Sequence, residues 1–273
     1  MKLLLLVPVI KNNDRWLVHA ISLVVFCSAI ANGLERDIVL PLIDGVSFDD
    51  LCPYQFGVLS NKRLMEIDSE NEEVNFSDRH IPHVSLFLTD FIDDKKDEIV
   101  GTVAHALQEF SNRTKYDSCE VKLEMADEKP IYSVGSGYAI WKIERTPCLQ
   151  ELSDTIVKAL EPFVNKQDMT IPAWVQNLPE PQRSTKIKLI HKYGSPNVFS
   201  EFEPHVTVGY NTHTNEQQKM NVLNSISLPT NCKGDISKVG IGHVGKSGGT
   251  VLKQGLLRLQ ISSTYVPPTE IMR

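Results

Sequence analysis

The 273-residue chain lacks the features that mark several classes of protein. Lys and Arg number 28 against 34 Asp and Glu, so there is none of the basic surplus that a general nucleic-acid binder needs. The 5 cysteines form no Cys-x-x-Cys pair, which argues against a zinc site. The turn sequence Lys246-Ser247-Gly248-Gly249 lacks the order of a phosphate-binding loop. The chain is long enough for one large domain or two small ones.

The N-terminal segment has the layout of a secretory signal. Arg15 precedes an apolar run that ends in small residues at Ala31. This order predicts a signal peptide over residues 1–31, with cleavage after Ala31, and leaves residues 32–273 as one domain. The alternative is a membrane anchor, which the shortness of the run and His19 within it disfavour. We therefore expect a protein that is secreted or lies in the secretory-pathway lumen, without stable membrane association.

Cysteine usage fits this route. Cys27 falls within the predicted signal, and the other four cysteines form an even set. In an oxidising compartment four cysteines allow two disulfides, with three connectivities open. This set consists of Cys52, Cys119, Cys148 and Cys232. Two glycosylation acceptor sequences, at Asn75 and Asn112, also predict a secreted glycoprotein.

Two copies of one short string are the most informative feature of the sequence. Pro82-His83-Val84-Ser85 and Pro204-His205-Val206-Thr207 each read Pro-His-Val followed by a small hydroxyl residue. In a strand, residues two apart share a face, so each motif would present its imidazole and its hydroxyl on one side. One such His is most often structural. Two copies, one in each half of the chain, predict a single site built from both.

The elements predicted around the motifs repeat in order. The strands at 83–88 and 205–210 are each followed by a polar loop, a helix that begins roughly ten residues later, and a strand. The first helix would be capped by Asp93 or Asp94 and has one apolar stripe, Ile99, Val103, Leu107 and Phe110; the second spans 215–226. Further strands are predicted at 55–60, 120–125, 138–143, 187–191, 236–244 and 256–261, and a helix at 149–164.

Two imidazoles and two hydroxyls, with no carboxylate or cysteine inside either motif, suit phosphodiester cleavage. One neutral imidazole can remove a proton while the other, as imidazolium, protonates the leaving oxygen. We predict His83 and His205 as the catalytic pair and Ser85 and Thr207 as the substrate-binding donors, with no metal or cofactor. The sequence does not decide which imidazole is the base. His80 is expected to lie off the strand face and outside the site.

The paired motifs resemble those of the 2H phosphoesterase superfamily, which is defined by two His-x-Ser/Thr-x motifs. The match lies in His83-Val84-Ser85-Leu86 and His205-Val206-Thr207-Val208, and the resemblance covers roughly residues 54–261. That family includes RNA 2′,5′ ligases and cyclic nucleotide phosphodiesterases. The resemblance implies an α+β, bilobal, pseudo-twofold fold, in which two antiparallel sheets flanked by helices line a central cleft.

The resemblance also implies a function. It suggests a monomeric, metal-independent phosphodiesterase that hydrolyses 2′,3′-cyclic phosphates or similar nucleotide or RNA phosphodiesters. Two alternatives stay open, a secreted protein that only binds nucleotides or RNA, and a ligase or phosphodiesterase for 2′,5′-linked RNA. A metal site built from the histidines is a weaker alternative, which predicts that chelators abolish activity.

Overall fold

The computed structural model of this chain describes residues 20–26, 54–67, 74–76, 79–167, 169–211, 215–227, 232–244, 250–252, 254–265 and 269–270. Within these ranges, no helix is both long enough and apolar enough to cross a membrane.

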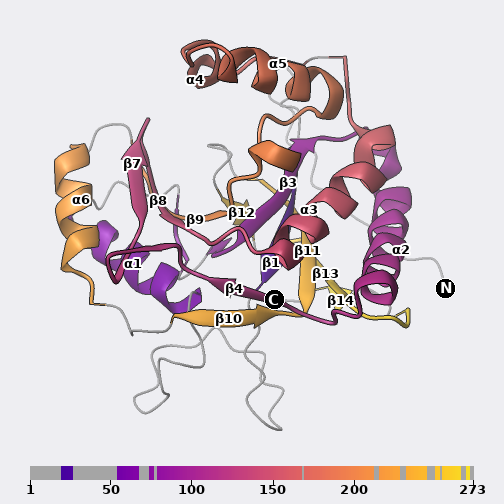
Figure 1. The fold of residues 1–273 in the computed structure, drawn as a ribbon, viewed down its shortest axis with the longest axis horizontal. Coiled ribbons are helices and arrows are strands. Elements are labelled where there is room, and N and C mark those ends of the chain that lie inside the picture. The colour runs from indigo at the N-terminus through magenta and orange to yellow at the C-terminus, as the bar shows by residue number, and fades with distance from the viewer. Residues whose placement is uncertain are drawn as a thin grey trace, which may run out of the picture.

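An antiparallel sheet of eight strands forms the centre of the molecule, in the order β14-β13-β11-β1-β3-β9-β8-β7 (Figure 1). Its strands are β1 (Ala20–Phe26), β3 (Val84–Asp90), β7 (Tyr132–Gly135), β8 (Tyr138–Lys142), β9 (His205–Tyr210), β11 (Lys238–His243), β13 (Leu257–Gln260) and β14 (Thr269–Glu270). Shorter pairs join β10 (Lys233–Ile236) to β4 (Cys119–Lys122), β12 (Val251–Leu252) to β2 (His80–Ile81), and β5 (Met125–Ala126) to β6 (Lys129–Pro130).

Helices lie around this sheet in three groups. The helices are α1 (Tyr54–Ile67), α2 (Lys96–Thr114), α3 (Pro147–Leu160), α4 (Ala173–Gln176), α5 (Gln182–Tyr193) and α6 (Glu216–Ser225). In Figure 1, α2 and α3 lie on the right, and α1 and α6 on the left. The α4–α5 pair lies at the top of the view.

The two motif strands are neighbours at the centre of the sheet. β3 and β9 run antiparallel and are joined by the single pair Val84↔Val206. Each strand is followed by a helix and a strand, α2 and β4 after β3, and α6 and β10 after β9. β4 and β10 also pair with each other antiparallel. The corresponding strands of the two halves thus pair with each other, which agrees with the predicted α+β fold and its pseudo-twofold repeat.

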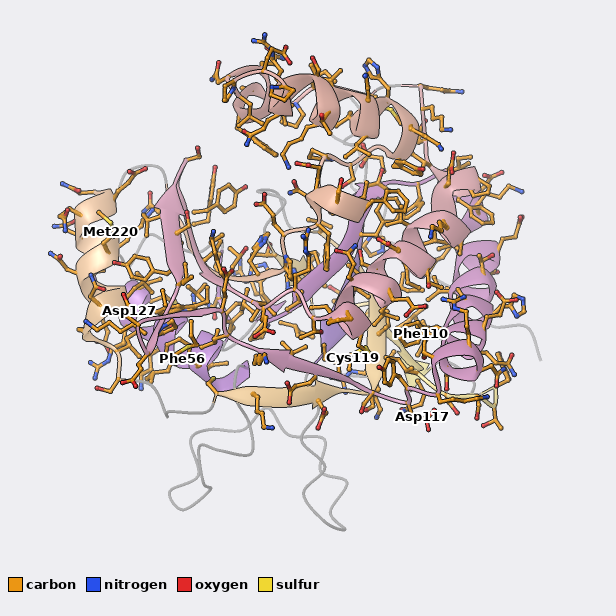
Figure 2. All side chains as sticks on the ribbon, viewed as in Figure 1. Phe56, Phe110, Asp117, Cys119, Asp127 and Met220 are labelled. Carbon is orange, nitrogen blue, oxygen red and sulfur yellow. A yellow bond between two sulfur atoms is a disulfide. The ribbon has the colours of Figure 1, made fainter. Side chains whose placement is uncertain are left out.

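One face of the central sheet packs on the helices. Val84 and Val206 are buried on this face, in a cluster that also contains Phe56 of α1 and Phe110 of α2. Figure 2 shows these two phenylalanines at opposite sides of the molecule. The core therefore runs through both lobes, and it packs against the two motif strands on the face that carries Val84 and Val206.

The apolar stripe of the first predicted helix is confirmed. Helix α2 buries Ile99, Val103, Leu107 and Phe110, as a spacing of three and four residues requires. Its N-cap is Lys95, whose side chain makes no capping hydrogen bond. The prediction that Asp93 or Asp94 caps this helix is wrong, because both residues lie in a short 3₁₀ helix that precedes it.

A strand predicted at residues 55–60 is part of helix α1. The short apolar run there does not distinguish a strand from a buried helix. α1 packs closely on β9, since a Cβ added at Gly57 would lie 3.3 Å from a methyl of Val206. Ser60 Oγ links α1 to the next strand, β8, by accepting a hydrogen bond from Trp141 Nε1 at 2.9 Å.

A second predicted strand, at residues 187–191, lies in helix α5. Only Lys186, Ile190 and Tyr193 of α5 are buried, so the helix covers its neighbours with a narrow stripe. It ends at Gly194, whose φ of 69° is the left-handed conformation that glycine adopts without steric cost.

One disulfide among the described residues joins Cys119 at the start of β4 to Cys148 in α3, with 5.6 Å between the Cα atoms. Of the three connectivities open to the four cysteines, this pairing leaves only the one that would join Cys52 to Cys232. Cys232 takes part in a disulfide as well, and Cys52 lies outside the described residues. The Cys119–Cys148 bond ties α3 to the strand pair β4–β10.

Strand β1 lies inside the segment predicted to be a signal peptide. It pairs with β11 over Ile21–Phe26 and with β3 over Ala20–Val25, so it separates these two strands in the sheet. A chain that begins after Ala31 would lack this strand and would leave β3 and β11 without a common partner. The signal peptide stays a prediction, and its cleavage conflicts with the sheet described here.

A pair of truncations tests this conflict. A variant that begins at Ala20 keeps β1, whereas one that begins at Asn32 lacks it. Because β1 is hydrogen-bonded along both edges, we expect the Asn32 variant to aggregate or to melt roughly 10 °C lower, which corresponds to a loss of about 3–4 kcal/mol. Equal melting temperatures for the two variants would show that the fold does not need β1 and would favour cleavage after Ala31.

Candidate active site

The alternation of β3 and β9 brings the four predicted site residues to one face. Val84 and Val206 point into the core, so the residues on either side of them point to the opposite face. These residues are His83, Ser85, His205 and Thr207. The structure therefore brings together all four side chains from the two halves of the chain.

The register of the strands sets the order of these side chains. Counting outward by one residue from the pair Val84↔Val206 places His83 across from Thr207 and Ser85 across from His205. Each imidazole thus neighbours the hydroxyl of the other motif. A reacting phosphate over this face would meet an imidazole and a hydroxyl on both sides.

Both imidazoles are oriented by the same kind of hydrogen bond. His83 Nδ1 lies 2.8 Å from the backbone oxygen of Ile81, and His205 Nδ1 lies 2.8 Å from that of Glu203. A carbonyl oxygen only accepts hydrogen bonds, so Nδ1 must carry the proton in each ring. In the neutral rings Nε2 is then the basic nitrogen, and it is the atom left to exchange protons with a substrate.

Burial sets the protonation of the pair. Burial lowers the pKa of His83 to about 4; the Ile81 carbonyl opposes this shift, and charge on His205 or His80 adds to it. The pKa of His205 is also lowered by burial, against the opposing effects of the Glu203 carbonyl and its carboxylate. Both imidazoles are therefore neutral near pH 7 in the free protein. An anionic phosphate would raise the pKa of either one.

His80 lies closer to the site than the sequence analysis predicted. Its side chain is buried in β2, and its Nδ1 accepts a hydrogen bond of 3.0 Å from the backbone N–H of Asn75. In the neutral ring the proton is then on Nε2, the opposite tautomer to that of His83. Charge on His80 would lower the pKa of His83. The feature of the sequence that could have pointed to His80 is its position, three residues before His83.

Strand β8 adds side chains to the same face that the sequence analysis missed. Lys142 pairs with His205, Ile140 with Thr207, and Tyr138 with Tyr210. The two tyrosine rings lie 4.5 Å apart between centroids. No local pattern marks these residues, because the pairing of β8 with β9 alone places them there.

Two cavities of the described structure lie away from the four motif residues. One, of about 560 Å³, is lined by Ile92 and by residues between Glu161 and Gln167, and another, of about 600 Å³, lies between α1 and α6. Among the residues the structure describes, no cluster of three or more His, Cys, Asp or Glu side chains could hold a metal ion.

A family model described as the 2'-5' RNA ligase superfamily matches residues 62–243 of this chain. The chain belongs to the 2'-5' RNA ligase superfamily. The matched region begins in α1, contains both His-x-Ser/Thr motifs, and ends with β11. The resemblance to the 2H phosphoesterases drawn from the two motifs is thereby confirmed.

Solved structures similar to this member of the superfamily include E. coli LigT complexed with phosphate, at 8% sequence identity and a TM-score of 0.36, covering 89% of this chain and 98% of LigT. Usb1 from Kluyveromyces marxianus is similar at 12% identity and a TM-score of 0.41, again covering 89% of this chain and 98% of Usb1. No curated protein matches the sequence.

The buried His83 imidazole predicts a specific dependence of stability on pH. The pKa of His83 is 6.5 in the unfolded chain and about 4 in the folded one. Between these two pH values the unfolded state therefore binds a proton that the folded state does not bind. The stabilisation is complete above pH 6.5 and is lost as the pH falls toward 4, by about 3 kcal/mol in total. We expect His83→Ala to reduce the slope of the free energy of unfolding against pH, measured with urea between pH 4 and 7. The buried His205, whose pKa is also lowered, keeps its own contribution to that slope.

His105→Ala is the matched control, because His105 lies exposed on α2. This variant should keep the slope of the parent protein. The same slope in the His83→Ala variant would contradict the assignment of the effect to His83.

Proposed function

We propose that this protein is a phosphodiesterase that hydrolyses 2′,3′-cyclic phosphates or similar nucleotide or RNA phosphodiesters. One observation carries the proposal: two imidazoles on one face, each anchored through Nδ1 at 2.8 Å to the carbonyl two residues before it. This arrangement leaves two Nε2 atoms for proton transfer at a single phosphate. Membership of the superfamily supports phosphodiester chemistry in general.

The reaction needs one imidazole that accepts a proton and one that donates a proton. His83 Nε2 removes a proton from water as the water oxygen forms a bond to phosphorus. The bond from phosphorus to one ribose oxygen breaks, and that oxygen takes the proton from Nε2 of the His205 imidazolium. The product is a nucleoside monophosphate, and proton exchange with solvent restores both rings.

Electrostatics favour this division of roles. Positive charge on His205 and on His80 opposes protonation of His83, which is also the more deeply buried ring. The Glu203 carboxylate favours protonation of His205. When the phosphate anion binds and raises both pKa values, His205 is therefore the ring that takes the proton.

Ser85 and Thr207 hold the phosphate in this proposal. Each hydroxyl lies across the β3–β9 pair from the imidazole of the other motif, and both can donate a hydrogen bond to a non-bridging oxygen. Such donors stabilise the charge that develops on these oxygens in the transition state. They also keep the phosphate between the two Nε2 atoms.

Secretion and the monomeric state form part of the same proposal. The disulfide between Cys119 and Cys148 supports an oxidising compartment. Asn112 is exposed near the end of α2 and is accessible to a glycan, whereas Ser77 of the other acceptor sequence lies outside the described residues.

Turnover of the four 2′,3′-cyclic nucleotides in EDTA tests the proposal. We expect the parent protein to be active and His83→Ala and His205→Ala each to lose at least about 10²-fold in kcat, since each ring transfers a proton. His105→Ala should retain full activity. Unchanged activity in either histidine variant would contradict the proposed mechanism. Loss of the parent protein's activity in EDTA would favour the alternative of a metal site.

The substrate panel separates the remaining alternatives. Turnover of a 2′,5′-linked dinucleotide without turnover of the cyclic nucleotides would favour the 2′,5′-linked RNA enzyme. Binding of nucleotides without any turnover would identify a binding protein. Chromatography of the monophosphate product determines which ribose oxygen leaves.

Removal of the hydroxyls tests their role separately. We expect Thr207→Val and Ser85→Ala to lower kcat about 10²–10³-fold each, because each deletes a donor to the transition state. Thr207→Ser should keep most of the activity, because it retains the hydroxyl. A Thr207→Ser variant as weak as Thr207→Val would show that packing of the methyl group matters more than the donor.

A further inference from the structure

We propose that Lys142 binds the phosphate next to the one that is cleaved, so that the site takes an oligonucleotide in preference to a mononucleotide. This inference rests on the proposed function, because it names the substrate class of the same site. It concerns specificity and assigns no proton transfer to Lys142.

The register of β8 and β9 places Lys142 on the catalytic face. Lys142 is the direct partner of His205, and Ile140 is that of Thr207. Partners across antiparallel strands project to the same face, with their Cβ atoms about 5 Å apart. Lys142 therefore stands one strand beyond His205, on the side away from His83.

The backbone of Lys142 is fixed while its side chain is exposed. Its N–H donates to the oxygen of Ile131 at 2.9 Å, and its carbonyl accepts from the N–H of Glu124 at 3.0 Å. The next residue, Ile143, donates to the oxygen of Pro204 at 3.0 Å, immediately before His205. The sheet thus holds the base of this lysine firmly beside the catalytic motif.

Lys142 has no counter-ion among the described residues, unlike Lys122 and Lys233 on the β4–β10 strand pair. Lys122 is paired with Glu144 at 3.0 Å, and Lys233 with Glu120 at 3.2 Å. Within the part of the chain that the structure describes, the Lys142 ammonium has no hydrogen-bond or ion-pair partner. An unpaired cation beside a phosphate-cleaving pair is available to a second phosphate.

The sequence of side chains along β8 gives the direction in which a longer substrate would extend. Tyr138, Ile140 and Lys142 follow one another on this face, beside Tyr210, Thr207 and His205 of β9. One end of this strip is the ring pair of the two tyrosines, and the other end is cationic. An additional phosphate therefore belongs at the Lys142 end, where a mononucleoside cyclic phosphate has no group.

Kinetics on two substrates test this inference. The substrates are uridine 2′,3′-cyclic phosphate and a uridine trinucleotide that ends in a 2′,3′-cyclic phosphate. We expect Lys142→Gln to lower kcat/KM at least about tenfold on the trinucleotide, as the loss of a charged hydrogen bond would, and less than twofold on the mononucleotide. Lys142→Arg should restore most of the loss, and the slope of log kcat/KM against log salt should fall by about one in Lys142→Gln.

Lys62→Gln is the matched control. Lys62 is exposed on α1, the helix that packs on the face of β9 opposite to His205, and its substitution should change neither substrate. Equal losses on both substrates in Lys142→Gln, or no loss on the trinucleotide, would overturn the inference.

A binding measurement separates failure of this inference from failure of the proposed function. Fluorescence anisotropy of a labelled, 3′-phosphorylated uridine trinucleotide needs no turnover. If the parent protein cleaves neither substrate, the proposed function fails, and the anisotropy alone decides the role of Lys142. Binding at least about tenfold weaker in Lys142→Gln than in Lys62→Gln then supports that role, and equal binding overturns it.

Discussion

The pairing of β3 with β9 at Val84 and Val206 is the contact on which the rest of the site depends. Among the residues that the structure describes, it is the one strand pairing that links the β3 side of the central sheet to the β9 side. Because both valines are buried in the core beneath, the two motifs must present their polar side chains on the opposite face. A one-residue slip in this pairing would turn an imidazole and a hydroxyl into the core, so apolar burial fixes the register of the two motifs.

The same burial that fixes the register also prepares the chemistry. Desolvation keeps both rings neutral in the free protein. The carbonyls of Ile81 and Glu203 accept a hydrogen bond from Nδ1 of each ring, which fixes the tautomer in which Nε2 is the basic nitrogen. The two halves are not electrostatically equal, since Glu203 lies beside one ring and His80 beside the other. A symmetric scaffold therefore carries an asymmetric pair, which is what acid–base catalysis requires.

The local elements that the sequence predicted well are those with a strong internal period. The stripe from Ile99 to Phe110 carries its own pattern of burial, at a spacing of three and four residues. The predictions that failed, at residues 55–60 and 187–191, concerned short runs whose apolar residues fit a strand or a helix equally well. In the first segment, the packing of α1 on β9 decided the backbone conformation. In the second, the contacts of α5 with its neighbours did so.

The sequence by itself determined which residues are predicted for the site and how they are grouped. The repeated Pro-His-Val-hydroxyl string predicted the four residues His83, Ser85, His205 and Thr207. The alternation of side chains along a strand placed the imidazole and the hydroxyl of each motif on one face. Only the tertiary structure decided that the two motif strands are neighbours, which cysteine pairs with Cys119, and that Lys142 and His80 lie beside His205 and His83. These contacts join segments far apart in the chain, and long-range strand pairing leaves no periodic trace in the sequence of either partner.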